Sequence, residues 1–143
     1  MRTGFPSQRR LTVAEANRRL PEVRTALEEA QEHLTQVRAL ARELNQIEAV
    51  GRTPSGEFVM AADHRADSEA LHHHRQACEA VFARLAQMGC MVKDLDLGIC
   101  DFPGSIAGRP VLLCWRQGEP AIMHYHTEDV GYARRKPIPP GTP

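Results

Sequence analysis

Residues 20–44 read LPEVRTALEEAQEHLTQVRALAREL, and the apolar residues in this stretch recur at alternating intervals of three and four. This spacing places them in one seam along a helix, and a seam of this kind packs against a second helix. The seam consists of Leu20, Val23, Leu27, Ala30, Leu34, Val37, Ala41 and Leu44. The stretch therefore predicts a long helix that has a partner helix.

The start of this helix is indicated by Thr12 and Glu15, which have the spacing of a capping box. In that motif the hydroxyl of Thr12 accepts a hydrogen bond from the backbone of residue 15, and the Glu15 carboxylate accepts one from residue 12. Pro21 lacks an amide proton, so we expect a short helical lead-in over residues 13–20 and then a kink or a new first turn. Two glycines and a proline within residues 51–56 predict a loop after the helix.

A second helix is predicted to begin between Asp63 and Ala66 and to end at Gly89, because the same three-four spacing returns there. After Gly89 the apolar period changes to two, which is typical of strands. The predicted strands are Met91–Val92, Leu97–Phe102, Pro110–Arg116 and Ala121–Thr127, with a hairpin turn at 117–120.

These elements predict an α+β fold, in which a long antiparallel helical hairpin packs with a small antiparallel sheet of three to four strands. We expect a single domain over residues 1–143, since the length and the 42% hydrophobic content suit one core. Within it, residues 12–89 form the helical hairpin and residues 90–135 form a β-meander. Residues 136–143 contain four prolines and are expected to be a flexible tail.

Charge and composition exclude several classes of protein. Eighteen basic residues balance eighteen acidic ones, so the basic surface of a nucleic-acid-binding protein is not expected. No apolar run is long enough to span a membrane, and the first residues lack the apolar core of a signal peptide. The four cysteines form no C-x-x-C pair, which argues against a zinc ribbon and a thioredoxin-like site. We therefore expect a cytoplasmic protein with reduced thiols.

Several motifs, in their order and spacing, resemble the bacterial family named domain of unknown function 2203. They are Thr12–Asn17 with Leu20-Pro21, Val92–Gly98, Asp101–Pro103, Leu113–Arg116 with Gly118-Glu119, and His126 with Asp129–Tyr132. The resemblance covers nearly the whole chain, and it implies a helical hairpin that leads into a small sheet. It implies no reaction. The chain departs from the family pattern before His126, where that pattern favours an aromatic pair and this sequence has His124 and Tyr125.

A first candidate site consists of His124, His126 and Asp129. Residues two apart on a strand share a face, so the two imidazoles would project together and Asp129 could approach them. Two imidazoles and a carboxylate are a common ligand set for divalent zinc or iron. The alternative is structural, with His126 hydrogen-bonded to Asp129 at the strand end and His124 packed on its neighbours.

A second candidate site is polar but not specific for a metal. It comprises Asp101, Arg116, His126, Asp129 and Arg135. If the sheet brings these side chains together, a guanidinium and an imidazole beside carboxylates would suit a small anion or a proton transfer. The alternative is a salt-bridge network that attaches the C-terminal segment to the sheet.

A third candidate lies on the second helix, where Cys78 follows His74 by four residues and so shares its face. This spacing is compatible with a soft metal ion, although a histidine on an apolar face is more often a hydrogen-bonded core or interface residue. The neighbouring His72 and His73 are expected to face water.

Two functional hypotheses follow. The first is a ligand-binding module whose polar site, for a divalent metal or a small anion, lies at the C-terminal end of the sheet. The second is a protein-protein interaction or dimerisation module, in which the helical seam forms a homodimer and no small-molecule site exists. An enzymatic role stays undecided, because no nucleophile and base can be paired from the sequence.

Overall fold

The computed structural model describes residues 10–50 and 61–143, and its contacts divide the chain into two compact units. Unit 1 comprises Met1–Glu28 and Phe82–Pro143, and unit 2 comprises Glu29–Val81. Each of the two long helices contributes residues to both units: α1 is Val13–Val50 and α2 is Ala61–Gln87. The predicted loop at 51–56 lies outside the described residues.

The capping box at the start of α1 is confirmed. The amide of Glu15 donates to the Thr12 hydroxyl at 3.1 Å, and the amide of Thr12 donates to the Glu15 carboxylate at 2.9 Å. The helix then continues through Pro21 without a break. Leu20 and Val23, on either side of Pro21, are both buried, so packing of the apolar face holds the helix together where one backbone hydrogen bond is missing.

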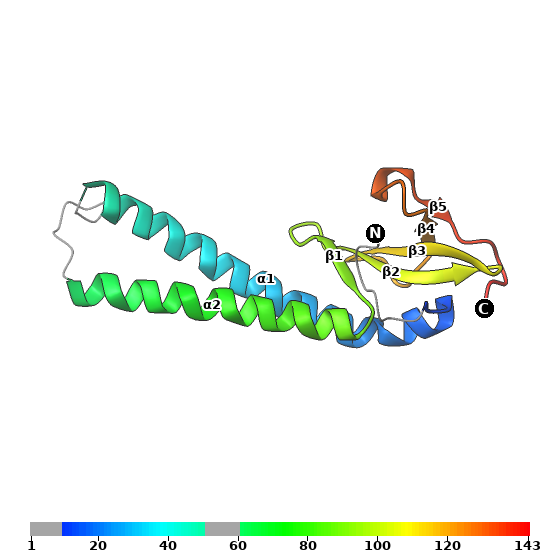
Figure 1. Ribbon diagram of the computed structural model, residues 1–143, viewed down its shortest axis with the longest axis horizontal. Coiled ribbons are helices and arrows are strands. Elements are labelled where there is room, and N and C mark those ends of the chain that lie inside the picture. The colour runs from blue at the N-terminus through cyan, green and yellow to red at the C-terminus, as the bar shows by residue number, and fades with distance from the viewer. Residues whose placement is uncertain (1–9, 51–60) are drawn as a thin grey trace. The chain divides into compact units, whose positions relative to one another are not determined.

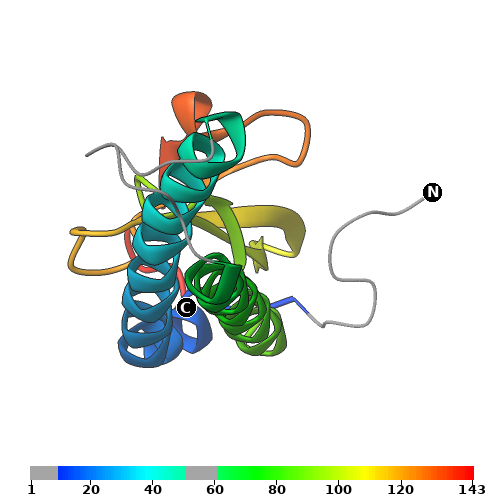
Figure 2. The same cartoon turned by 90° about the vertical axis from the view of Figure 1, so that its left-hand side faces the viewer.

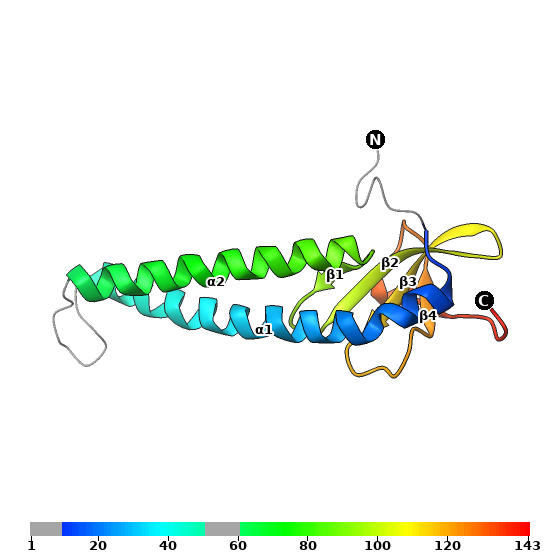
Figure 3. The same ribbon diagram turned by 90° about the horizontal axis from the view of Figure 1, so that it is seen from below.

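Unit 2 is an antiparallel pair of helical segments that lie side by side (Figures 2 and 3). Its buried apolar residues come from both segments: Ala30 and Leu44 from α1, and Leu71, Cys78 and Val81 from α2. The predicted helical hairpin is therefore confirmed, and α2 is the partner helix for the seam in this unit. No helix among the described residues combines the length and apolarity that crossing a membrane requires.

Unit 1 contains a five-stranded antiparallel sheet in which the strand order follows the sequence (Figure 1). Its strands are β1 Met91–Asp94, β2 Ile99–Ile106, β3 Arg109–Arg116, β4 His124–His126 and β5 Lys136–Pro137. The α+β class and the meander are confirmed, with one strand more than the sequence predicted.

The additional strand, β5, lies in the segment that was expected to be a tail. Tyr125 pairs with Lys136 and His124 with Pro137, and the amide of Ile138 donates to the carbonyl of Met123 at 2.9 Å. Because β5 is an edge strand, Pro137 can lie there without leaving a ladder hydrogen bond unmade in the sheet interior. The proline-rich segment therefore contains an edge strand and the residues that continue from it.

The first turns of α1 lie against one face of the sheet (Figures 1 and 3). Trp115, Phe102 and Leu113 are fully buried, and the guanidinium of Arg24 lies 5.7 Å from the centre of the Trp115 ring. The amide of Ile122 also donates to the Asn17 side chain at 2.8 Å. Trp115 therefore anchors the sheet on the helix.

The register of β2 and β3 is set by a two-residue turn at Ala107 and Gly108, whose φ values are +53° and +78°. Positive φ at both central residues is typical of the tight hairpin turn that suits the twist of antiparallel strands. With this turn, Asp101 pairs directly with Cys114. The turn therefore determines which polar side chains face each other across the sheet.

Candidate functional site

Three metal-ligating side chains meet on one face of the sheet: Asp101 from β2, Cys114 from β3 and His126 from β4. Asp101 lies opposite Cys114, and His126 lies opposite Leu112, two residues from Cys114 on the same strand. Residues that pair, or that lie two apart, share a face of a sheet. All three are buried, and one donor atom from each lies within 4.8 Å of the others. We call this group the buried triad.

The imidazole of His126 is held at both nitrogens. Its Nδ1 lies 2.8 Å from the carbonyl oxygen of Thr127, and because a carbonyl can only accept, Nδ1 carries the proton. Its Nε2 lies 3.0 and 3.1 Å from the two carboxylate oxygens of Asp101. The ring nitrogen that faces Asp101 therefore needs a second proton or a cation beside it. A histidine that donates one N–H to a backbone carbonyl is the usual arrangement of a metal ligand.

The thiol of Cys114 completes the buried triad. Burial and the nearby negative charge of Asp101 together raise the pKa of Cys114 to about 12, and Arg135 offsets only part of this increase. A thiol of this kind is protonated at neutral pH and is a poor nucleophile by itself. A metal ion would have to displace the proton, as it does at other thiolate sites.

A groove of about 660 Å³ has His126 of the buried triad in its wall, but neither Asp101 nor Cys114. It is formed by the tip of the β2–β3 hairpin, by β4 and by the segment that follows β4 up to Lys136. Its volume is in the range of ligand pockets, roughly 300–1,000 Å³.

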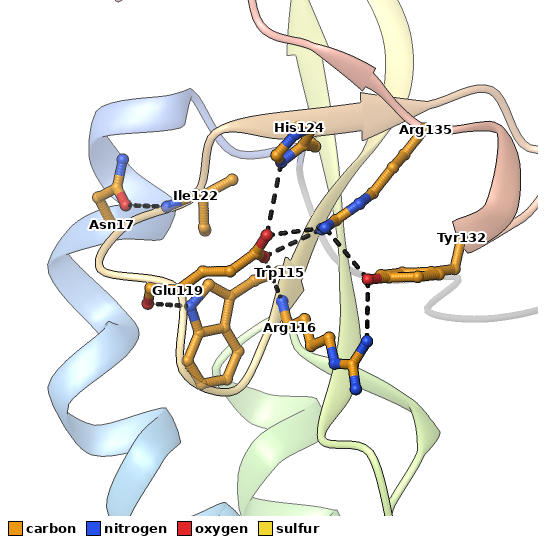
Figure 4. Close-up of polar contacts among 8 residues, drawn as sticks. All are labelled: Asn17, Trp115, Arg116, Glu119, Ile122, His124, Tyr132 and Arg135. Atoms are coloured by element: carbon orange, nitrogen blue, oxygen red, sulfur yellow. Dashed lines mark hydrogen bonds and ion pairs between the residues drawn. The ribbon is translucent and has the colours of Figure 1, made fainter.

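A second polar cluster surrounds Glu119, in the turn between β3 and β4 (Figure 4). The guanidinium of Arg135 donates to both carboxylate oxygens of Glu119 at 3.0 and 2.7 Å, and the amide of Arg116 donates to the same carboxylate at 2.7 Å. The guanidinium groups of Arg116 and Arg135 also donate to the hydroxyl of Tyr132 at 3.3 and 3.2 Å.

Electrostatics in this cluster favour the charged forms. Burial alone would raise the pKa of Glu119, but the hydrogen bonds from Arg135 and from the Arg116 amide outweigh burial and lower it. The hydrogen bond to Glu119 in turn raises the pKa of Arg135. A bidentate, charge-assisted pair of this geometry attaches the segment before β5 to the β3–β4 turn. Of the two arginines in the second candidate site, Arg135 forms the ion pair with Glu119, whereas the guanidinium of Arg116 contacts the Tyr132 hydroxyl.

His124 belongs to this cluster rather than to the buried triad. Its Nδ1 lies 3.7 Å from a Glu119 carboxylate oxygen, which is within ion-pair range but too long for a hydrogen bond. The same nitrogen is buried and has no hydrogen-bond partner among the described residues. His124 shares a sheet face with His126, as the sequence predicted, but it contacts a different carboxylate.

Asp129 lies apart from the buried triad. Its carboxylate is exposed and accepts a hydrogen bond from the Thr127 hydroxyl, which lowers the pKa of Asp129. His126 instead contacts Asp101. Among the described residues, the ligand set that assembles therefore replaces His124 and Asp129 with Asp101 and Cys114. The sequence signal for Cys114 was the turn at residues 107–108, since placing that turn pairs Cys114 with Asp101.

The third candidate separates into two contacts within unit 2. His74 Nδ1 lies 2.8 Å from Nδ1 of His33 on the opposite helix. The thiol of Cys78 donates to the Ala30 carbonyl at 3.5 Å, and burial raises its pKa. His74 and Cys78 therefore contact different partners, which agrees with the interpretation that both are core or interface residues.

Comparison with known proteins gives a match to a protein family. No curated protein and no solved structure matches the chain. A family model, described as an uncharacterized conserved protein (DUF2203), matches residues 9–138, which include both helices, all five strands and every residue of the buried triad. The chain therefore belongs to the DUF2203 family.

Proposed function

We propose that the protein is a small ligand-binding module, in which Asp101, Cys114 and His126 bind a divalent transition metal beside an open groove. The observation that carries the proposal is the orientation of His126. Its Nδ1 is fixed on a backbone carbonyl, while Nε2 faces a buried carboxylate and lies within 4.8 Å of a thiol. Three protein ligands would leave a fourth position for water or a bound molecule.

The donor types favour zinc or ferrous iron over magnesium or calcium. Thiolate and imidazole are ligands for the softer transition metals, whereas the alkaline-earth ions prefer oxygen donors alone. Burial also favours this proposal, because a carboxylate in an apolar environment is costly unless a cation compensates its charge. The cation can be a metal ion or the protonated imidazole of His126, and the two cases differ in the role of Cys114.

The experiment compares metal binding by the untagged protein and by variants, with Co²⁺ as the probe. Bound thiolate gives Co²⁺ a near-ultraviolet charge-transfer band, so the band reports Cys114 directly. We expect Cys114→Ser to lose the band and His126→Gln to lose tight binding. Cys100→Ser is the matched control, because Cys100 is equally buried on β2 but is not part of the buried triad.

The ring cluster of the helical hairpin is removed in a background that carries His33→Gln, His73→Gln and His74→Gln, so that these three imidazoles do not contribute. If this background protein takes up no Co²⁺ at micromolar concentration, or if Cys114→Ser keeps the full band, the metal proposal fails. The contact between Asp101 and His126 would then be a structural ion pair.

A second candidate function is self-association through the helical hairpin. Leu34, Val37 and Ala41 stay half-exposed along α1 even though α2 packs beside it in unit 2. Burying such a stripe against a second copy would be favourable. Light scattering of the wild type and of Val37→Glu tests this candidate: a dimer that becomes a folded monomer supports it, and a wild-type monomer at high concentration excludes it.

We also propose a cytoplasmic location. All four cysteines, Cys78, Cys90, Cys100 and Cys114, are buried free thiols. This state is the one expected in a reducing compartment. Fractionation of the native organism's cells, followed by immunodetection of the protein, tests the location.

A further inference from the structure

The groove beside His126 has a charge pattern of its own. Three cationic residues line it, Arg109, Arg134 and Lys136, and none of its described lining residues is acidic. The chain as a whole has equal numbers of acidic and basic residues. The excess of positive charge is therefore local to this groove.

The acidic residues nearest in sequence are engaged elsewhere. Glu128 forms an ion pair with Arg10 at 2.7 Å, and Arg10 is itself held by the carbonyls of Gly104 and Val111. Asp129 accepts from the Thr127 hydroxyl and interacts with Arg134. Arg109 and Lys136 have no ion pair with another described residue. These two cations are thus available to a ligand.

The remaining wall of the groove is apolar. Tyr125, Val130, Ile106 and Pro110 supply most of it. Ligand pockets commonly combine an apolar wall with a few charged groups that orient the ligand. An inorganic ion would leave this apolar wall uncovered, whereas a molecule with an apolar body and one charged end would use both parts.

We propose that the groove binds a small organic anion, a carboxylate or phosphate monoester with an apolar body, whose charged end lies at Arg109 and Lys136 with the body against Tyr125 and Val130. This inference rests on the proposed ligand-binding role and names the class of ligand. Because His126 forms part of the same wall, a bound anion would lie next to this one residue of the buried triad.

The test uses probes of one shape and three charges: benzoate, benzamide and benzamidine, with phenyl phosphate as the second anion and inorganic phosphate as the anion without a body. Binding to metal-free protein is followed by two-dimensional ¹H–¹⁵N NMR. We expect benzoate and phenyl phosphate to shift the amides of Tyr125 and Val130, benzamide to bind more weakly, and benzamidine not to bind. Inorganic phosphate should bind more weakly than phenyl phosphate.

Single substitutions test which cationic residues bind the charged end of the anion. Arg109→Gln and Lys136→Gln should each weaken phenyl phosphate binding about two- to fivefold, which is the range for one exposed charge pair, and should leave benzamide unchanged. Lys93→Gln is the matched control, since Lys93 is an exposed cation on β1, outside the groove. All three positions are exposed, so the fold should be retained, and circular dichroism verifies this.

The outcomes separate the two proposals. Equal binding of benzoate and benzamidine, or an equal loss in Lys93→Gln, overturns the anion groove. Anion binding by a protein that takes up no Co²⁺ overturns the metal site and leaves the groove intact. Uptake of Co²⁺ by a protein whose amide signals no anion shifts supports the metal site and overturns the anion groove. The titrations are repeated with Zn²⁺-loaded protein, in which tighter anion binding would show that the two sites are coupled.

Discussion

The Nε2 atom of His126 lies at nearly equal distances, 3.0 and 3.1 Å, from both carboxylate oxygens of Asp101, and both side chains are almost completely buried. The two residues are 25 positions apart in the sequence. Their contact joins β2 to β4 across β3, so it connects strands that do not pair with each other. A buried contact of this kind contributes to the fold whether or not a metal binds.

Breaking this contact should destabilise the metal-free protein. Removal of one partner leaves the other polar group buried without compensation, which costs about 3–5 kcal/mol. We therefore expect Asp101→Ala to lower the free energy of unfolding by about this amount in urea denaturation. In the Asp101→Ala, His126→Ala double variant the loss should be smaller than the sum of the single losses, since no uncompensated partner remains. Additive losses would contradict a direct contact.

Metal affinity should rise with pH. The raised pKa of Cys114, about 12, means that the thiol is protonated throughout the neutral range, and one proton must leave for each metal bound. The apparent association constant should therefore increase on the order of tenfold per pH unit. Competition with a chelator of known affinity, at several pH values, measures it. For Cys114→Ser a similarly steep dependence would show that the released proton comes from another group.

The Glu119 cluster should stabilise the fold above acidic pH. Since the pKa of Glu119 is lowered in the folded protein, its contribution is fully present above the ordinary value of 4.5. Below that value the unfolded chain binds the proton first, so the contribution is lost as pH falls through the folded pKa. Urea unfolding at neutral pH and at about pH 4 should show a smaller acid-induced loss for Glu119→Gln than for the wild type.

A matched control for this effect is Glu128→Gln, because Glu128 is exposed and its carboxylate pairs with Arg10 instead of with Arg135. We expect this variant to retain the acid-induced loss of the wild type. If Glu119→Gln and Glu128→Gln have the same pH profile, the hydrogen bonds from Arg135 do not produce the effect.

The turn at residues 107–108 should respond in opposite directions to two substitutions. Ala107 has a φ of +53°, a conformation that costs an L-residue about 1–2 kcal/mol and costs glycine almost nothing. Ala107→Gly should therefore raise the thermal midpoint, while Gly108→Ala should lower it. A Cβ at position 108 meets no atom within 4 Å, so its effect would report backbone strain alone. A lower midpoint for both variants would contradict the turn geometry.

The hairpin histidines offer a pair of matched variants. His74 is hydrogen-bonded to His33 at 2.8 Å, whereas His72, two residues away on the same helix, is exposed. Replacing His74 by alanine should lower the free energy of unfolding by about 1 kcal/mol, because the hydrogen bond is lost. Replacing His72 by alanine should change the free energy of unfolding by at most about 0.5 kcal/mol. Urea unfolding of the two variants measures the difference. Equal losses would place the stabilisation in helix propensity rather than in the interhelical bond.

Local patterns predicted the helical half of the fold well. The three-four spacing of the seam and the capping box of Thr12 and Glu15 depend on residues that are close together in the sequence, and the structure has both features. The strands β1 to β4 were also predicted, with shifted ends. Residues 136–137 were missed because a two-residue edge strand that contains proline forms only when a neighbouring strand is available.

The candidate site depended on more distant relationships. The sequence by itself determined that ionisable and ligating side chains gather on the C-terminal strands, and it identified Asp101 and His126 among them. Only the tertiary structure decided that Cys114 joins them and that His124 turns to Glu119. The reason is physical: strand register sets which side chains face each other, and that register depends on one two-residue turn at Ala107 and Gly108.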